Sequence, residues 1–179
     1  MDVPPLSDQE SLVRAFFCPE QHNGEEFLTN AVSLDDLKDR GFSVDRPILT
    51  PISVLTHRLE SQRVKNSEER EYAKFSELYY AKLKEDRDSA GQSYFDVQSS
   101  PVQKSDEEPA NPGHASIYSA DKNLGKGGLR KVRTELIKHL NNIVTLENIA
   151  YLQDMALGEN AGSSISQMDQ SSNDPTSAS

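Results

Sequence analysis

A turn-forming string opens a short alternation of apolar and polar residues two thirds of the way along this chain. The string Asn111-Pro112-Gly113 leads into His114-Ala115-Ser116-Ile117-Tyr118-Ser119. Alternation with a period of two is typical of a strand that has one buried face. Tyr94-Phe95-Asp96-Val97 shows a similar pattern. We therefore expect a small sheet built around residues 93–98 and 114–119.

Most of the other periodic segments favour helices. Ser7 and Glu10 have the spacing of a capping box, which predicts a helix over about residues 8–17. A cap at Ser33 and a glycine at Gly41 predict a second helix over 34–40, followed by a short strand or extended turn at 42–44. Thr50-Pro51 is a good helix start. Apolar residues at helical spacing predict further helices over 129–143 and 146–155.

The charged stretch from Ser67 to Arg87 carries an aromatic stripe. Tyr72, Phe75, Tyr79 and Leu83 lie at i, i+3, i+7 and i+11, which predicts one apolar face of a long amphipathic helix. This face either packs on the core or binds a partner.

Together these segments predict a helix-rich α+β fold with a small β-sheet. We expect residues 1–157 to form a single domain, in which the Ser-, Pro- and acid-rich stretch 99–110 is a mobile loop. Residues 158–179 contain no Lys or Arg and are rich in Ser, so we expect a disordered tail.

Composition narrows the class of protein. Cys18 is the single cysteine, so no intramolecular disulfide is possible. We see neither a signal peptide nor an apolar run long enough to span a bilayer. We therefore expect a soluble cytoplasmic protein without membrane contact. The four histidines show no metal-binding spacing, and no cofactor is indicated.

Three residues are candidates for catalysis. His114 enters a strand directly after a turn, where imidazole could perform acid–base chemistry or simply bind a local carbonyl. Asp45 and Arg46 could orient a phosphate or substrate, or could form an internal ion pair. The sequence does not show which residues approach one another.

The chain has a net charge of −10, but one segment is positively charged. Residues 122–139 have six basic side chains against Glu135. Glycines at 125, 127 and 128 precede a predicted helix, so Lys126, Arg130 and Lys131 could contact an anion. The Walker A spacing is absent. The alternative is an ordinary turn before a solvated helix face.

Two short motifs resemble those of a loose group of small uncharacterised bacterial proteins. That group shows an (L/F)SVxR stretch, here Phe42 to Arg46, and a later NPxHA element, here Asn111, Pro112, His114 and Ala115. The resemblance covers about residues 11–140 and implies a bacterial or phage origin without implying an activity. The charged stretch 67–87 is longer here than in the group.

The leading functional hypothesis is a non-catalytic protein-binding subunit of a multi-protein bacterial or phage system, possibly a defence system. It depends on the missing enzyme signatures and on the charged amphipathic segment. One alternative is a hydrolase or nuclease that uses His114 with Arg46 or Asp45. A second is a nucleic-acid or phosphate contact module that uses residues 122–139.

Overall fold

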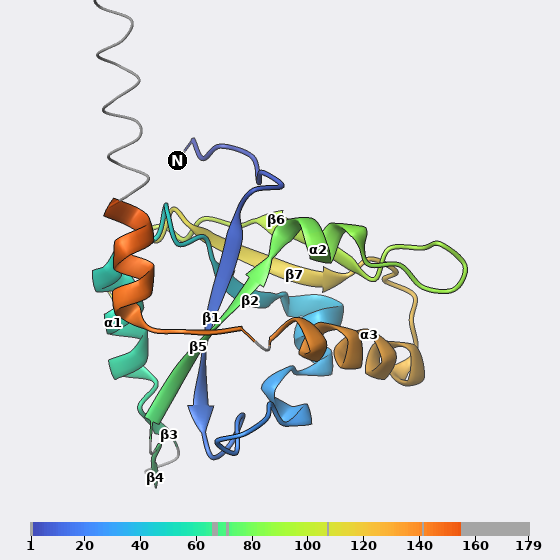
Figure 1. Ribbon diagram of the computed structural model, residues 1–179, viewed down its shortest axis with the longest axis horizontal. Helices are drawn as coiled ribbons and strands as arrows, with labels where there is room; N and C mark the ends of the chain where they lie inside the picture. The colour runs from blue at the N-terminus through green and yellow to red at the C-terminus, as the bar shows by residue number, and fades with distance from the viewer. Residues whose placement is uncertain (1, 66–67, 71, 107, 141, 155–179) are drawn as a thin grey trace, which may run out of the picture.

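A six-stranded antiparallel sheet forms the centre of the computed structural model, which describes residues 2–65, 68–70, 72–106, 108–140 and 142–154. The strand order is β6-β7-β2-β1-β5-β8, and the short strands β3 and β4 form a separate two-stranded ribbon (Figure 1). The strands are β1 (Ser11–Cys18), β2 (Phe42–Asp45), β3 (Val64–Lys65), β4 (Glu68–Glu69), β5 (Tyr72–Tyr79), β6 (Phe95–Ser99), β7 (His114–Ser119) and β8 (Asn142–Val144).

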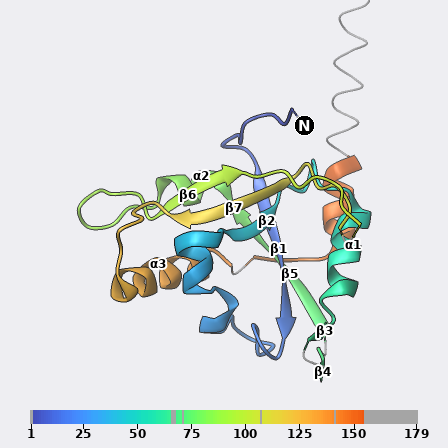
Figure 2. The same ribbon diagram turned by 180° about the vertical axis from the view of Figure 1, so that it is seen from behind.

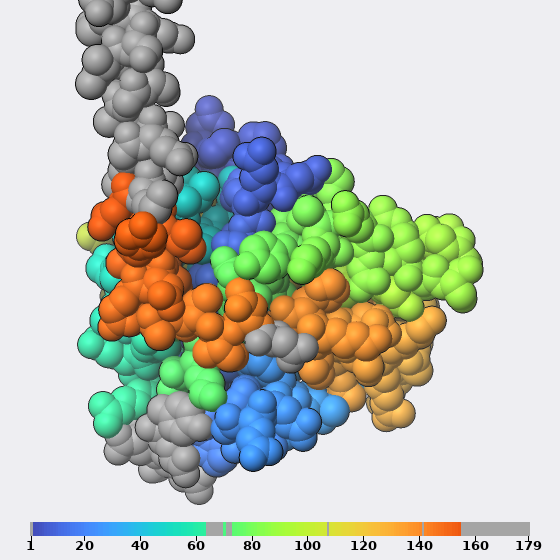
Figure 3. All heavy atoms as spheres, in the orientation of Figure 1, coloured from blue at the N-terminus to red at the C-terminus, as the bar shows by residue number. Residues whose placement is uncertain are grey.

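Helices cover both faces of this sheet. They are α1 (Ile52–Ser61), α2 (Tyr80–Glu85), α3 (Lys126–His139) and the short turns η1 (Thr29–Ala31) and η2 (Asp36–Arg40). Residues 146–154 are also helical. Figures 1 and 2 show α1 and the 146–154 helix on one side of β1 and β5, with α3, η1 and η2 on the other. In the space-filling view, the 146–154 helix (dark orange) and α3 (lighter orange) both lie on the surface (Figure 3). Among the described residues, no helix is long and apolar enough to cross a membrane.

The face under α3 holds the larger apolar core. Phe16 on β1, Phe42 on β2 and Ile117 on β7 are fully buried there, together with Leu136 of α3. A smaller apolar cluster lies on the opposite face, where Leu55 of α1 and Ile149 pack against Val13 and Phe75. Because β1 is central, its side chains are buried in both directions.

The predicted helix-rich fold is wrong, because two segments expected to be helical are the longest strands. Residues 11–18 form β1, which pairs with β5 through all eight of its residues, from Ser11↔Tyr79 to Cys18↔Tyr72. The capping-box residues do bond, with the backbone N–H of Ser7 donating to Glu10 Oε1 at 3.0 Å. The chain then continues as a strand. The box therefore closes a turn here and does not begin a helix.

The aromatic stripe is also not helical. Tyr72 to Tyr79 form β5, and only residues 80–85 form the helix α2. A spacing of four residues returns to the same side of a strand as well as of a helix, so Phe75 and Tyr79 fit both periods. The extended pairing with β1 decides the structure.

Other predicted elements are confirmed. Residues 34–40 are helical and end at Gly41, whose φ of 84° lies in the left-handed region. Residues 42–45 are β2, and the two predicted strands of the small sheet are β6 and β7. Helix α1 follows Thr50-Pro51, and α3 follows the glycine turn. The helix predicted over 129–143 is too long, because α3 ends at His139 and residues 142–144 form the strand β8. The predicted tail, residues 158–179, lies outside the described residues.

Candidate functional site

The Asn111-Pro112-Gly113 turn is fastened to two other segments by a buried amide. Asn111 Nδ2 donates to Asp45 Oδ1 at 2.7 Å, and Asn111 Oδ1 accepts from Thr50 Oγ1 and from the Gly113 N–H, each at 3.0 Å. A Cβ on Gly113 would lie 2.1 Å from Thr50 Oγ1, so the close approach requires glycine. The turn therefore holds β2, β7 and the start of α1 together.

Asp45 is committed to this network. Its side chain is 2% exposed, and its second carboxylate oxygen forms an ion pair with Arg58 of α1. Both oxygens thus have partners, which compensates for the burial of the charge. The sequence analysis did not identify Arg58 or Asn111 as members of this site.

Arg46 lies apart from Asp45, because successive residues of extended chain point in opposite directions. Its guanidinium binds both carboxylate oxygens of Glu10, at 2.7 and 2.8 Å. It also donates to the carbonyls of Pro4 and Pro5. With 1% exposure, Arg46 fixes the N-terminal arm and does not enter a cavity with His114.

His114 stands directly opposite Asp45 in the β2–β7 pair. Its Nδ1 lies 2.8 Å from the carbonyl oxygen of Ser100 and 2.9 Å from Ser100 Oγ. A carbonyl can only accept, so Nδ1 carries the proton, and Nδ1 therefore cannot act as a base for the Ser100 hydroxyl. Burial lowers the pKa of His114, which favours the neutral form of the ring.

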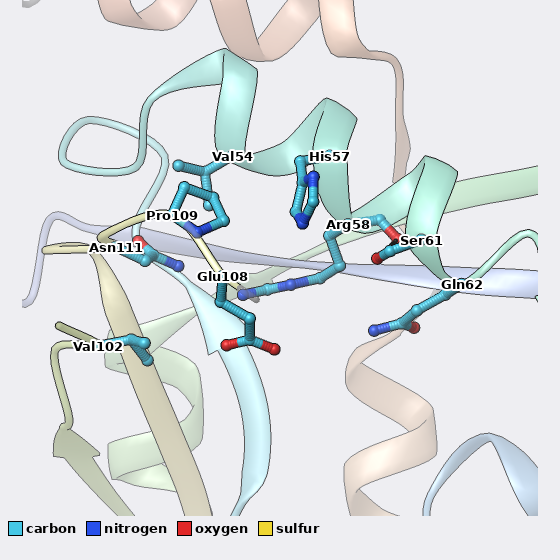
Figure 4. Close-up of a pocket in the computed structure, with 9 residues that line it drawn as sticks. All are labelled: Val54, His57, Arg58, Ser61, Gln62, Val102, Glu108, Pro109 and Asn111. Carbon is cyan, nitrogen blue, oxygen red and sulfur yellow. Dashed lines mark hydrogen bonds between the residues drawn. The ribbon is translucent and has the colours of Figure 1, made fainter. Parts of the chain in front are cut away.

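Two neighbouring hollows lie beside this network. The first, of about 140 Å³, lies between α1 and the loop that precedes Asn111, with His57, Arg58 and Glu108 among its lining residues (Figure 4). The second, of about 260 Å³, shares Arg58 and Glu108 with the first and extends to Arg14, Arg70 and His114. We call the second hollow the arginine basin. Its three guanidinium groups come from β1, from α1 and from the chain just before β5.

The predicted anion-binding residues lie on α3, which is on the other side of β1 and β5 from α1, the helix that contributes Arg58 to this basin. Lys126 and Arg130 are exposed. The ammonium of Lys131 is 5.5 Å from the ring centroid of Tyr94, and a hydrogen bond with Tyr94 raises the pKa of Lys131. A hollow of about 480 Å³ lies between Lys131 and the segment that leads into β6.

The four stripe residues do not share one surface. Phe75 and Leu83 are buried in the two different apolar clusters, whereas Tyr79 is 44% exposed and donates its hydroxyl to Glu77. The side chain of Tyr72 lies outside the described part of the chain. Within that part, no three His, Cys, Asp or Glu side chains are grouped so as to hold a metal ion.

Comparison of the chain with protein families, with characterised proteins and with solved structures finds no match.

Proposed function

We propose that this chain is a non-catalytic protein-binding component, and that the partner contacts an apolar patch near the start of α1. The patch consists of Ile48 and Leu152, which are 48% and 41% exposed and line the same depression. Tyr151, which is 63% exposed, precedes Leu152 in the chain. We call it the Ile48 patch. It carries the proposal because large apolar side chains gathered on a protein surface favour binding of another protein.

The patch borders a depression, and hydrogen bonds hold the segments around it in place. Ile48 and Leu152 line a depression of about 340 Å³ whose other wall is formed by residues 7–11. The side-chain amide of Gln153 donates to the carbonyls of Pro47 and Thr50, at 2.5 and 2.7 Å, and so ties the 146–154 helix to the turn. The surface is therefore already formed before a partner arrives, which lowers the entropy cost of binding.

The charges around the patch indicate the chemistry of the partner. The segments 7–11, 47–50 and 146–154 contain no Lys or Arg and four carboxylates, namely Asp8, Glu10, Glu147 and Asp154. Glu10 is neutralised by Arg46, and Asp8 by Lys84 at 2.8 Å. The excess of negative charge favours a partner segment that inserts an apolar side chain and carries basic residues beside it.

The hydrolase alternative receives less support. Arg46 is separated from His114, Asp45 is held by Arg58 and Asn111, and Nδ1 of His114 is engaged by Ser100. The resemblance to small bacterial proteins extends the proposal to a cytoplasmic, multi-protein bacterial or phage system, including a defence system. A nucleic-acid contact through Lys126 and Arg130 is the second alternative.

The test compares two charged variants with a matched control. Ile48→Asp and Leu152→Asp place a carboxylate in the patch, whereas Ile143→Asp changes a residue of similar exposure on the edge strand β8. Affinity capture from the source organism with the wild-type chain identifies the partner. Titration with the purified partner should then show binding that Ile48→Asp and Leu152→Asp weaken at least about tenfold, while Ile143→Asp leaves it unchanged.

Salt sensitivity supplies a second criterion. Binding should weaken as salt rises and when basic residues of the partner segment are replaced. Equal binding by all three variants would exclude the Ile48 patch. A partner captured only through Lys126 and Arg130 would favour the nucleic-acid alternative or a different protein surface.

A further inference from the structure

We propose that the arginine basin is a binding site for a small phosphate-type oxyanion. Three guanidinium groups, those of Arg14, Arg58 and Arg70, line one hollow of about 260 Å³ together with His114 and the side chains of Gln21 and Ser43. A bound water occupies roughly 30 Å³, so the basin has room for a phosphate group and several waters. Guanidinium matches the geometry of phosphate oxygens and binds them through paired N–H groups.

Arg14 is the arginine of the basin whose charge is balanced least directly: the carboxylates of Asp36 and Asp45 attract it, but neither forms an ion pair with it. Strands β1 and β2 are in register only at Val13↔Asp45, and Arg14 lies next to this point, where the strands separate. Its Nη1 donates to the carbonyl of Ser43 at 2.5 Å, and the guanidinium lies 4.1 Å from the ring centroid of Phe42. Among the described residues Arg14 has no ion pair, and its buried Nε has no hydrogen-bond partner.

The pKa of Arg14 reflects the free energy that it costs to bury this guanidinium. Burial lowers the pKa of its guanidinium to about 10. The carboxylates of Asp36 and Asp45 offset this lowering only in part. A buried charge without an ion-pair partner is costly, and an anion in the basin would offset that cost. This residue therefore supplies the main attraction for a ligand.

Arg58 and Arg70 are held in place by scaffold contacts. Arg58 is paired with Asp45, and Arg70 donates to Glu20 at 2.8 Å and to the carbonyl of Gln62 at 2.9 Å. The guanidinium of Arg70 also lies 4.3 Å from the ring centroid of Phe17. Groups oriented in advance in this way can donate further hydrogen bonds without losing much conformational entropy.

Glu108 is the acidic side chain that lines the basin, and it comes from the loop before Asn111. It also lines the hollow of Figure 4, where it lies across from Arg58. Its exposed carboxylate partly balances the arginine charge, so it competes with an incoming anion. Removal of this charge should strengthen anion binding, which gives the site a variant that gains affinity.

The experiment is a titration of the whole chain with inorganic phosphate in 150 mM sodium chloride, followed by amide chemical shifts. Acetate serves as the carboxylate probe. The expected result is saturable phosphate binding that moves the amide signals of residues 14, 43 and 114. Arg14→Met and Arg70→Met should each weaken it at least about tenfold. Glu108→Gln should tighten it several-fold.

Arg133→Met is the matched control, because Arg133 also has a buried Nε without a partner but belongs to α3. It should leave phosphate binding unchanged. The proposal is overturned if no phosphate binds up to 50 mM, if acetate binds as tightly, or if Arg133→Met weakens binding as much as Arg14→Met. If Arg14→Met fails to fold, the Glu108→Gln variant tests the proposal in its place. Phosphate binding by Glu108→Gln that is unchanged or weaker also overturns the proposal.

Discussion

The face of the sheet under α3 buries sixteen apolar side chains in one cluster, whereas the cluster under α1 and the 146–154 helix has four among the described residues. The α1 side instead contains a polar network of Asp45, Asn111 and Thr50, and the arginine basin lies beside it. The α3 side is held by burial of apolar area, and the α1 side largely by directed bonds between polar groups. On the α1 side, a polar group can therefore give up a hydrogen bond within the protein and form one with a ligand.

The difference between the two faces predicts that substitutions on the α3 side cause the largest loss of stability. Phe16→Ala should lower the free energy of unfolding by about 3–5 kcal/mol, because Phe16 is fully buried and packs edge-on against Phe27 at 4.8 Å. Leu59→Ala, on the partly buried margin of the α1 side, should cost clearly less. Urea denaturation of both variants measures the difference. Equal losses would show that the two faces contribute alike.

A polar truncation on the α1 side should have an intermediate effect. Asn111→Ala leaves Asp45 Oδ1, the Thr50 hydroxyl and the Gly113 N–H without their shared partner, so we expect a loss of about 2–3 kcal/mol. Asn23→Ala, in an exposed turn, is the control and should change little. If Asn111→Ala is as stable as the control, the network does not support that face.

The smallest effect should appear on acidification. Burial lowers the pKa of His114 in the folded chain, so protonation favours the unfolded state. The neutral ring contributes its full share to the free energy of unfolding at pH values above the unfolded pKa of about 6.5. That share is lost as the pH falls below this value. The charges that act on the ring are Asp45, Arg58 and Glu108.

The measurement compares His114→Gln with the wild type by thermal melting from pH 7.5 to 5.0, in buffers without phosphate. The variant should lose less stability over this interval, because Gln does not titrate. The pKa of His22 is also lowered by burial, so His22→Gln reports how much of the wild-type loss arises elsewhere. Parallel curves for wild type and His114→Gln would contradict the expected role of His114.

Strands with one apolar and one polar side could be predicted from the sequence. In β7, Ala115 and Ile117 on one side are buried in the larger cluster, whereas His114 and Ser116 on the other side are polar, and the Asn111-Pro112-Gly113 turn marks the start. Strands β1 and β5 were missed because central strands bury both sides, which removes the period-two signal: Leu12 and Val13 are both buried, on opposite faces. Tertiary pairing then outweighed the capping-box and stripe spacings.

The candidate site was only partly visible for a different reason. Asp45 and His114 stand beside turns that the sequence displays, and they do lie opposite each other. Arg14, Arg58 and Arg70 belong to three segments that meet only in the folded chain. No local pattern connects them, because a cavity depends on contacts between residues far apart in the sequence.

The strand order also has a consequence for synthesis of the chain on the ribosome. The central strands β1 and β2 emerge first, but β2 pairs with β7, whose Ile117 lies opposite Phe42. Until residues 114–119 leave the exit tunnel, one edge of β2 has no partner strand and presents free N–H and C=O groups. An unpaired strand edge invites association with other chains. Nascent chains arrested shortly before residue 114 should therefore need a chaperone more than finished ones.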